Sequence, residues 1–187
     1  MKPDYQKTMY ACFIAYIVQA VVVCFAPLLF VTFQSEYGIP LARITLLITV
    51  TFTVQLVVDF LSAGFVDRIG YRAAALLAHG CAAAGLVCLA LLPDLLPDPF
   101  WGLMVAACIY AVGGGLIEVL VSPIVEACPT DNKETAMSLL HSFYSWGQVG
   151  VVLVSTLFFV VFGIENWKVL ALSRRDRTSR PAPDAVR

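Results

Sequence analysis

The chain has 187 residues, of which 60% are hydrophobic and only 13% are charged, and its formal net charge is −1. A soluble domain carries about 25% charged residues, and the mean hydropathy here is +0.84. Composition therefore excludes an ordinary soluble protein and predicts an all-α protein that crosses a lipid bilayer several times. The small net charge gives no support for a nucleic-acid partner.

Five apolar segments are each long enough to cross a hydrocarbon core of about 30 Å as a helix. We predict transmembrane helices over about residues 8–33, 41–66, 73–92, 100–128 and 134–162. Residues 1–7 are a short polar leader before the first of them. The predicted breaks are turns and loops at 34–40, 67–72, 93–99 and 129–133. Asp131 and Glu134 have a spacing that caps a helix, so we expect the fifth helix to start there.

The distribution of basic residues predicts the orientation of the chain. The leader and the turns after the second and fourth helices carry Lys2, Lys7, Arg68, Arg72 and Lys133. The opposite side carries only Arg43 before the fifth helix ends. Because basic residues accumulate on the cytoplasmic side, we expect a plasma-membrane protein whose N-terminus is cytoplasmic.

The C-terminal residues differ from the rest of the chain. Residues 167–172 (WKVLAL) begin like a further apolar segment, but residues 173–187 read SRRDRTSRPAPDAVR, a composition typical of disorder. With five helices these arginines would lie outside, against the positive-inside rule. We expect this tail to result from a truncation or frameshift near Leu172, and a genuine basic tail is the alternative.

The stretch GFVDRIGYR closes the second predicted helix. Gly64 would let helices approach closely, Gly70 permits a turn with positive φ, and Asp67, Arg68 and Arg72 place charges at the interface. An ordinary charged loop that sets topology is one interpretation. The stretch also resembles the loop between helices 2 and 3 of the major facilitator superfamily, Gly-x-x-x-Asp-Arg-x-Gly-x-Arg, with the first glycine one place nearer. This resemblance implies a gating role for the motif.

Polar side chains form a stripe on each of the last two predicted helices. Spacings of three and four residues place Gly115, Glu118, Ser122 and Glu126 on one face of the fourth helix. The corresponding face of the fifth helix carries Ser138, His141, Ser145 and Gln148. The helical rise places Glu118 and Ser145 roughly 16 Å deep, and His141 about 10 Å deep. In an antiparallel pair, Glu118 would lie level with Ser145.

A carboxyl group at this depth is unfavourable unless it faces a partner or a wet cavity. Burial favours its neutral form, so Glu118 is a candidate to carry a coupling proton or to bind a substrate hydroxyl. Ordinary hydrogen bonds between helices are the competing interpretation for the serines and Gln148. We expect a substrate and proton site made of Glu118, Ser122, His141, Ser145 and Gln148.

The same region resembles the fucose-permease-like branch of the superfamily. It has Gly113, Glu118 and Pro123 in the order GxxxxE with a proline five residues on, followed by HSFYSWG on the next helix. The resemblance implies sugar binding and proton coupling by Glu118. The branch's fucose permease also has an acid before a proline in helix 1, whereas here the residues before Pro27 are VVVCFA and only Gln19 is polar. This departure argues against fucose itself and against coupling by two acids.

Two further ionisable residues lie inside predicted helices. Asp59 lies about 12 Å from the turn at residue 67, nearer the cytoplasmic end than the midplane. We expect it to act in gating or in an ion pair with an arginine rather than to contact substrate. His79 lies among alanines and glycines, and we interpret it as packing or as a hydrogen bond between helices.

The resemblance implies the N-terminal part of a secondary transporter for a sugar or similar small polar solute. Family members have two bundles of six helices, so helix 6 and the second bundle are missing, and we expect no transport unless a second chain supplies them. A small structural or partner-binding membrane protein is the alternative. The sequence has no hydrolase elbow, zinc-protease motif or phosphate loop, and its six cysteines have no metal spacing. We therefore predict no enzyme, metal or cofactor.

Overall fold

The computed structural model describes residues 5–130 and 132–172, and this part of the chain contains helices and no strands. The helices are α1 (Tyr5–Leu28), α2 (Phe30–Tyr37), α3 (Leu41–Ile69), α4 (Tyr71–Leu95), α5 (Pro99–Ala127), α6 (Lys133–Phe162), a 3₁₀ turn (Ile164–Asn166) and α7 (Trp167–Leu172). Five of them, α1, α3, α4, α5 and α6, are long and apolar enough to cross a membrane. The predicted all-α fold with five transmembrane helices is confirmed.

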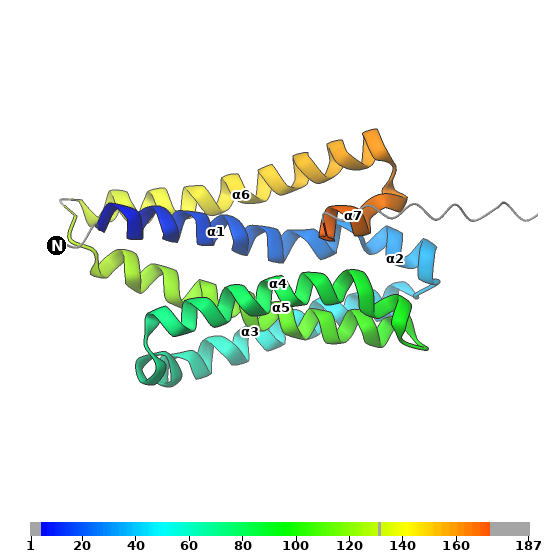
Figure 1. Ribbon diagram of the computed structural model, residues 1–187, viewed down its shortest axis with the longest axis horizontal. Coiled ribbons are helices and arrows are strands. Elements are labelled where there is room, and N and C mark those ends of the chain that lie inside the picture. The colour runs from blue at the N-terminus through cyan, green and yellow to red at the C-terminus, as the bar shows by residue number, and fades with distance from the viewer. Residues whose placement is uncertain (1–4, 131, 173–187) are drawn as a thin grey trace, which may run out of the picture.

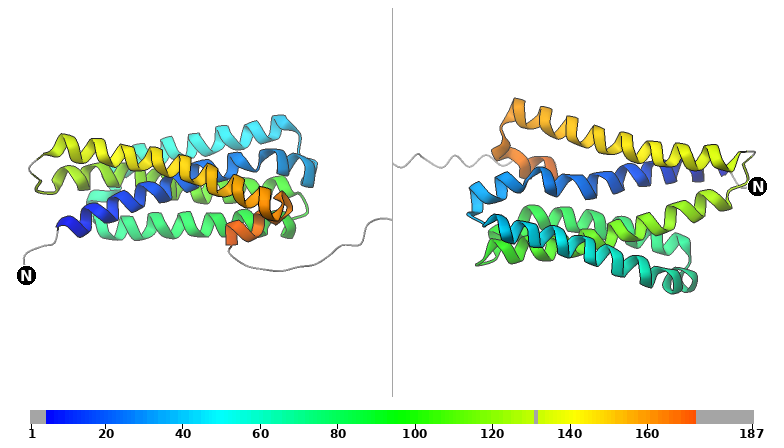
Figure 2. Two further views of the ribbon diagram at one scale, coloured as in Figure 1. Left: turned by 90° about the horizontal axis from the view of Figure 1, so that it is seen from above. Right: turned by 180° about the vertical axis from the view of Figure 1, so that it is seen from behind.

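The five long helices form one bundle with two ends (Figures 1 and 2). The start of α1, the α3–α4 junction and the α5–α6 turn lie at one end, which we call the Gly70 end after the residue between α3 and α4. The α2–α3 turn, the α4–α5 turn and α7 lie at the other, the Gly38 end, named after the glycine that follows α2. In Figure 1, α4 and α5 run side by side, α3 packs against α5, and α1 lies between α5 and α6.

The first predicted helix is divided in two. The helix is interrupted at Leu29, where φ is −97° and ψ is 1°. Helix α2 then continues to Tyr37, past residue 34, where the predicted turn begins. Pro27 explains the break, because proline lacks the amide proton that would bond to the preceding turn. The Leu29 amide instead donates to the carbonyl of Ala26 at 3.0 Å, three residues back.

The predicted charged turn at 67–72 is much shorter in the structure. Helix α3 continues through Asp67 to Ile69, and Gly70 alone separates it from α4. Its φ of +83° is the positive value expected for this glycine. Gly64 does not mediate the expected close approach, since a Cβ there would have nothing within 4 Å among the described residues.

The other helix boundaries shift by a few residues. Helix α4 extends through Pro93 to Leu95, so the predicted loop at 93–99 contains only three residues outside helices. The cap of α6 is Asn132, whose side chain accepts a hydrogen bond from the Thr135 amide at 3.0 Å. Asp131, the expected cap, lies outside the described residues, as do Lys2 and the predicted tail at 173–187.

Glycines on both helices bring α4 and α5 into close contact. A Cβ at Gly85 of α4 would lie 2.5 Å from the Tyr110 backbone nitrogen of α5. A Cβ at Gly113 of α5 would lie 2.5 Å from the Ala82 nitrogen of α4. Small residues allow such approaches between membrane helices, where packing rather than water drives association.

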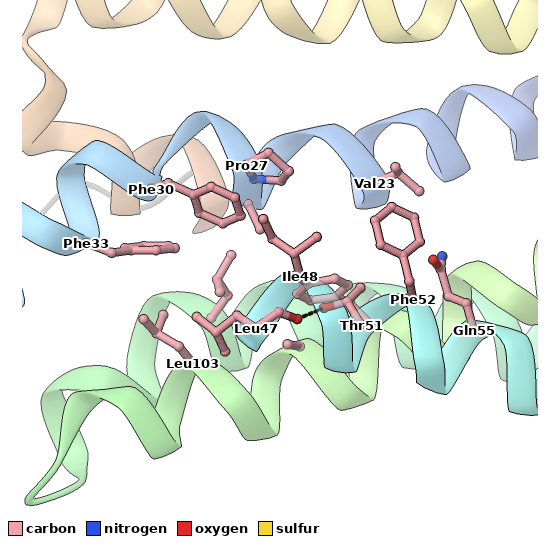
Figure 3. A pocket seen from close by; sticks show the side chains of 14 residues that line it. Val23, Pro27, Phe30, Phe33, Leu47, Ile48, Thr51, Phe52, Gln55 and Leu103 are labelled. Carbon is pink, nitrogen blue, oxygen red and sulfur yellow. Dashed lines mark hydrogen bonds between the residues drawn. The ribbon is translucent and has the colours of Figure 1, made fainter. Parts of the chain in front are cut away.

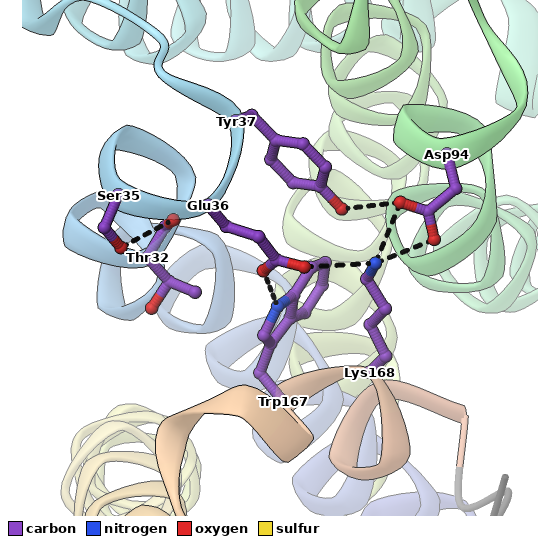
Figure 4. Close-up of polar contacts among 7 residues, drawn as sticks. All are labelled: Thr32, Ser35, Glu36, Tyr37, Asp94, Trp167 and Lys168. Atoms are coloured by element: carbon purple, nitrogen blue, oxygen red, sulfur yellow. Dashed lines mark hydrogen bonds and ion pairs between the residues drawn. The ribbon is translucent and has the colours of Figure 1, made fainter. Parts of the chain in front are cut away.

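A polar cluster joins α7 to the Gly38 end of the bundle (Figure 4). The fully buried Trp167 donates its indole N–H to the Glu36 carboxylate at 2.8 Å. The Lys168 ammonium contacts Asp94 at 2.7 Å and Glu36 at 3.4 Å, and the Tyr37 hydroxyl donates to Asp94 at 3.0 Å. This set, the Trp167 cluster, connects α2, α4 and α7.

Two groups of the Trp167 cluster, the Lys168 ammonium and the Tyr37 hydroxyl, have pKa values above their ordinary values. Burial lowers the pKa of Lys168, but hydrogen bonds to Asp94 and Tyr37 and the charge of Glu36 raise it, so that the net pKa is above its ordinary value. Burial raises the pKa of Tyr37, and Lys168 opposes only part of this effect. Both groups therefore keep their protons to higher pH when the cluster is formed.

The close approach of α4 and α5 can be tested with two glycines of one helix. Gly85→Ala should destabilise the folded protein by about 1–3 kcal/mol, because its Cβ would collide with the Tyr110 backbone. Gly80→Ala, where a Cβ meets nothing within 4 Å, should be neutral or stabilising by up to about 1 kcal/mol. Unfolding in mixed detergent micelles measures both, and equal stabilities would contradict the packing described here.

The Trp167 cluster should come apart only at alkaline pH. Because the pKa values of Lys168 and Tyr37 are both raised, the docking of α7 should be fully stable below about pH 10 and weaken as pH rises above it. Replacing the exposed Trp101 and Trp146 by Phe leaves Trp167 as the single tryptophan, whose emission should then shift to the red as α7 undocks. Lys168→Met should show that shift already at neutral pH. Loss of docking near neutral pH in the parent would contradict this account.

Candidate functional site

A polar pocket lies in the middle of the bundle, and four transmembrane helices contribute to it. It has a volume of about 300 Å³. We call it the central pocket. It is lined by Val23 (α1), Phe52, Gln55, Leu56 and Asp59 (α3), Glu118 (α5) and Tyr144 (α6). A polar concavity built by several helices at this depth is where a bundle can hold a small solute.

Two carboxyl groups face the central pocket. Glu118 accepts a hydrogen bond at 3.4 Å from the side-chain amide of Gln19 in α1. One oxygen of Asp59, Oδ1, is fully buried and has no hydrogen-bond partner among the described residues. Both carboxyl groups line this one cavity. Among the described residues, no arginine or lysine lines the pocket to compensate them.

A run of three glycines in α5 gives these side chains their space. Gly113 faces the α4 backbone, as described above. A Cβ at Gly114 would lie 2.9 Å from the Gln55 amide nitrogen and 3.1 Å from the Gln19 amide oxygen. A Cβ at Gly115 would lie 3.2 Å from Asp59 Oδ1. Polar groups of α1 and α3 can therefore approach the α5 backbone only because the α5 side chains are absent here.

Tyr16 of α1 connects α5 and α6 beside the central pocket. Its hydroxyl lies 3.1 Å from the Ser122 hydroxyl, within hydrogen-bonding distance. Its ring lies 5.8 Å from the His141 ring and 5.7 Å from the Tyr144 ring, measured between centroids. Ser122 and His141 thus occupy the same level of the bundle, on either side of Tyr16.

The structure differs from the expected hairpin, in which Glu118 faced Ser145 and His141 directly. Helix α1 lies between α5 and α6, so Gln19 rather than an α6 side chain contacts Glu118. The Ser145 hydroxyl donates to the His141 carbonyl of its own helix at 3.2 Å. Gln148 lies near Tyr144 of its own helix and near Cys24 of α1. Sequence neighbours in a bundle need not be packed neighbours.

Asp59 lies deeper than the sequence suggested. The expectation counted from residue 67, but α3 ends at Ile69, which places Asp59 about 15 Å from the helix end. It faces the same pocket as Glu118 and pairs with no arginine among the described residues. The expected ion pair is therefore not formed in this part of the chain.

The motif residues lie away from the central pocket, at the Gly70 end. Asp67 and Arg68 are exposed in the last turn of α3, and Arg72 is exposed in the first turn of α4. None of the three forms a hydrogen bond or ion pair with another described residue. The described structure therefore gives this motif no internal partner.

A second, narrower cavity extends from the central pocket toward the Gly38 end, between α1 and α3 (Figure 3). It has a volume of about 40 Å³, and it shares Val23, Phe52 and Gln55 with the central pocket. Most of its lining is apolar, including Pro27 and Phe33. In Figure 3, the Gln55 amide extends from α3 toward α1, at the end of this cavity nearest the central pocket.

The remaining candidate groups carry no site in the described part of the chain. His79 Nδ1 lies 2.8 Å from the carbonyl of Ala75, one turn back in its own helix. The cysteines are all free there, and no group of three potential metal ligands occurs among the described residues. The central pocket is thus the place where chemistry-bearing side chains converge.

Sequence reasoning missed several residues of the pocket. Gln55 and Asp59 are four residues apart and share one face of α3, but of the two only Asp59 is predicted from the sequence to have a role, in gating or in an ion pair. Tyr16 and Tyr144 belong to an aromatic-rich background, so nothing in the sequence distinguished them. Gln19 was recognised as the polar residue of its helix, but its partner Glu118 is 99 residues away.

Comparison with known proteins gives one significant match. The family model described as Major Facilitator Superfamily matches residues 9–172, which contain the central pocket and the five transmembrane helices except for the first turn of α1. No curated protein and no solved structure matches the chain significantly.

The contact between Tyr16 and Ser122 should be measurable as a coupling energy. Tyr16→Phe and Ser122→Ala each remove one hydroxyl of the pair, and a double-mutant cycle should give about 0.6 kcal/mol of interaction. Ser142→Ala is a matched control, since the Ser142 hydroxyl bonds within its own helix, and its coupling to Tyr16→Phe should be near zero. Equal couplings for the two serines would show that Tyr16 does not pair with Ser122.

Proposed function

The chain belongs to the major facilitator superfamily, and we propose that it forms part of a secondary transporter for a sugar or similar small polar solute, coupled to protons through Glu118. The family consists of membrane transporters and not of enzymes, so a membrane-embedded enzyme is set aside. A purely structural or partner-binding role is likewise not favoured. The fucose-permease-like features of α5 and α6 support a sugar as the solute class.

The central pocket is the observation that carries this proposal. It places two carboxyl groups, the Gln55 amide and a phenol at the surface of an open cavity, and the Gln19 amide donates a hydrogen bond to one of the carboxyl groups. Sugars offer hydroxyl groups that donate and accept hydrogen bonds, and such side chains satisfy both. A carboxyl group buried in a membrane is also the side chain best suited to take up and release a proton.

The proposed roles of the residues follow their positions. Glu118 binds the coupling proton and a hydroxyl of the solute. Ser122 and His141 act through Tyr16, which joins them at the side of the pocket. Ser145 and Gln148 belong to the α6 wall, where Gln148 supports Tyr144. The gating motif consists of Gly64, Asp67, Arg68, Gly70 and Arg72 at the Gly70 end.

We also propose an orientation in the plasma membrane, with the Gly70 end at the cytoplasm. The basic residues at that end, including Lys7, Arg68 and Arg72, support this orientation. Transport in this superfamily depends on two six-helix bundles that move about a site between them. The five described helices supply one wall of such a site, so transport would require further helices to supply the other wall.

Proton coupling can be tested by solute binding, which needs no transport. Labelled glucose, galactose, mannose and fucose are offered to the protein in lipid nanodiscs at acidic, neutral and alkaline pH. If one proton binds together with the solute, affinity should change by up to about tenfold per pH unit. In Glu118→Gln this pH dependence should disappear, because a glutamine side chain does not ionise in this pH range.

Glu126→Gln is the matched control, because Glu126 is an exposed carboxyl group of the same helix outside the pocket. It should keep the parental pH dependence. A Glu118→Gln variant that binds sugars with the same pH dependence as the parent would refute proton coupling. Absence of sugar binding at every pH would refute the sugar class itself.

A further inference from the structure

The charge of the central pocket is unbalanced. Asp59 and Glu118 come from different helices and face one cavity, and no lysine or arginine in the described part of the chain lines it. Two uncompensated carboxylates inside a bilayer are strongly unfavourable, so the pocket favours the entry of positive charge. One proton on Glu118 would neutralise only half of this charge and would leave Asp59 without a partner.

The unsatisfied polar atoms around the pocket are mainly acceptors. Asp59 Oδ1 and the Gln19 amide oxygen are buried and have no hydrogen-bond partner among the described residues. Gln55 is only 7% exposed, lines the pocket and makes no hydrogen bond within the described part of the chain. Of these residues, Gln55 and Asp59 line the pocket, so their side chains keep hydrogen-bonding capacity that a donor-rich ligand can use.

The remaining lining suits an organic ligand better than a bare ion. Phe52 and Tyr144 present aromatic rings to the cavity, and aromatic faces attract organic cations. The volume of about 300 Å³ is at the lower end of the range for small-molecule pockets. An ammonium group has three donors and a single positive charge, and it satisfies both the charge and the acceptors.

We propose that Asp59 and Glu118 together bind the ammonium group of an amine-bearing solute, such as an amino sugar. This inference rests on the proposed function, in that the central pocket is the solute site, and it adds the charge of the solute. Asp59 then has a binding role instead of the gating role that its sequence position suggested. The Gln19 and Gln55 amides provide further hydrogen-bonding groups around the bound solute.

Glucosamine and glucose form a matched pair of probes. They differ in one substituent, an ammonium group in the first and a hydroxyl in the second. Calorimetry on the protein in lipid nanodiscs at neutral pH should show glucosamine binding at least about tenfold tighter than glucose. This comparison uses the parent protein, so it remains decisive even if a variant fails to fold.

Two single-residue variants then test whether the preference for glucosamine depends on Asp59. Asp59→Asn should reduce the ratio of glucosamine to glucose affinity to about one, whereas Glu126→Gln should retain the parental ratio. Circular dichroism and a monodisperse elution profile establish that each variant is folded. A parental ratio in folded Asp59→Asn would overturn the proposal, because the ammonium would then be bound elsewhere.

Two outcomes separate this inference from the proposed function. If glucose and glucosamine bind equally, the ammonium site is wrong while a sugar site stands. If neither sugar binds but ethanolamine does, and Asp59→Asn abolishes that binding, the ammonium site stands and the sugar class is wrong. Sodium chloride titrated alone should give no binding heat. If it does give a heat, and Asp59→Asn removes that heat, the site binds a metal cation and the ammonium proposal is wrong.

Discussion

The absence of side chains at Gly113, Gly114 and Gly115 is the constraint on which the rest of the structure depends. Each glycine faces a different neighbour: the α4 backbone, the amides of α1 and α3, and the Asp59 carboxyl group. A Cβ at any of the three positions would lie within about 3.2 Å of these atoms. One turn of helix α5 therefore sets both the packing of the bundle and the room for its polar groups.

Helix α1 is the second determinant, because it lies between the two helices that sequence order would pair. Its residues Gln19 and Tyr16 contact Glu118 and Ser122 of α5, and Tyr16 also packs against α6. The polar stripes of α5 and α6 are thus connected by side chains of α1 and not by direct hydrogen bonds to each other. At the Gly38 end, the Trp167 cluster holds α7 against α2 and α4, so the segment after α6 is tied back to the bundle.

The charged motif and Glu118, which carry the resemblance in the sequence, lie at different places and have different surroundings. The charged motif at Asp67 and Arg68 is exposed at the Gly70 end and has no internal partner in the described residues. Glu118 is exposed to the open central pocket, which it shares with groups from three other helices. Charges at a membrane interface are hydrated, whereas those at the midplane depend on their protein neighbours. The motif can therefore be recognised from a short stretch, but the pocket requires the whole bundle.

The sequence by itself determined the number of transmembrane helices, the positive φ of Gly70 and the position of Glu118 inside the fourth of these helices. These features depend on apolar length, on backbone sterics and on helical rise, which are local properties. The sequence did not determine that the chain breaks near Pro27 or that α3 runs on to Ile69, because helix ends depend on weak local preferences. Only the tertiary structure decided that Gln19 contacts Glu118 and that Asp59 shares its pocket. Lipid surrounds every apolar helix alike, so hydropathy does not specify which helix faces come together, and that choice depends on where glycines permit close packing.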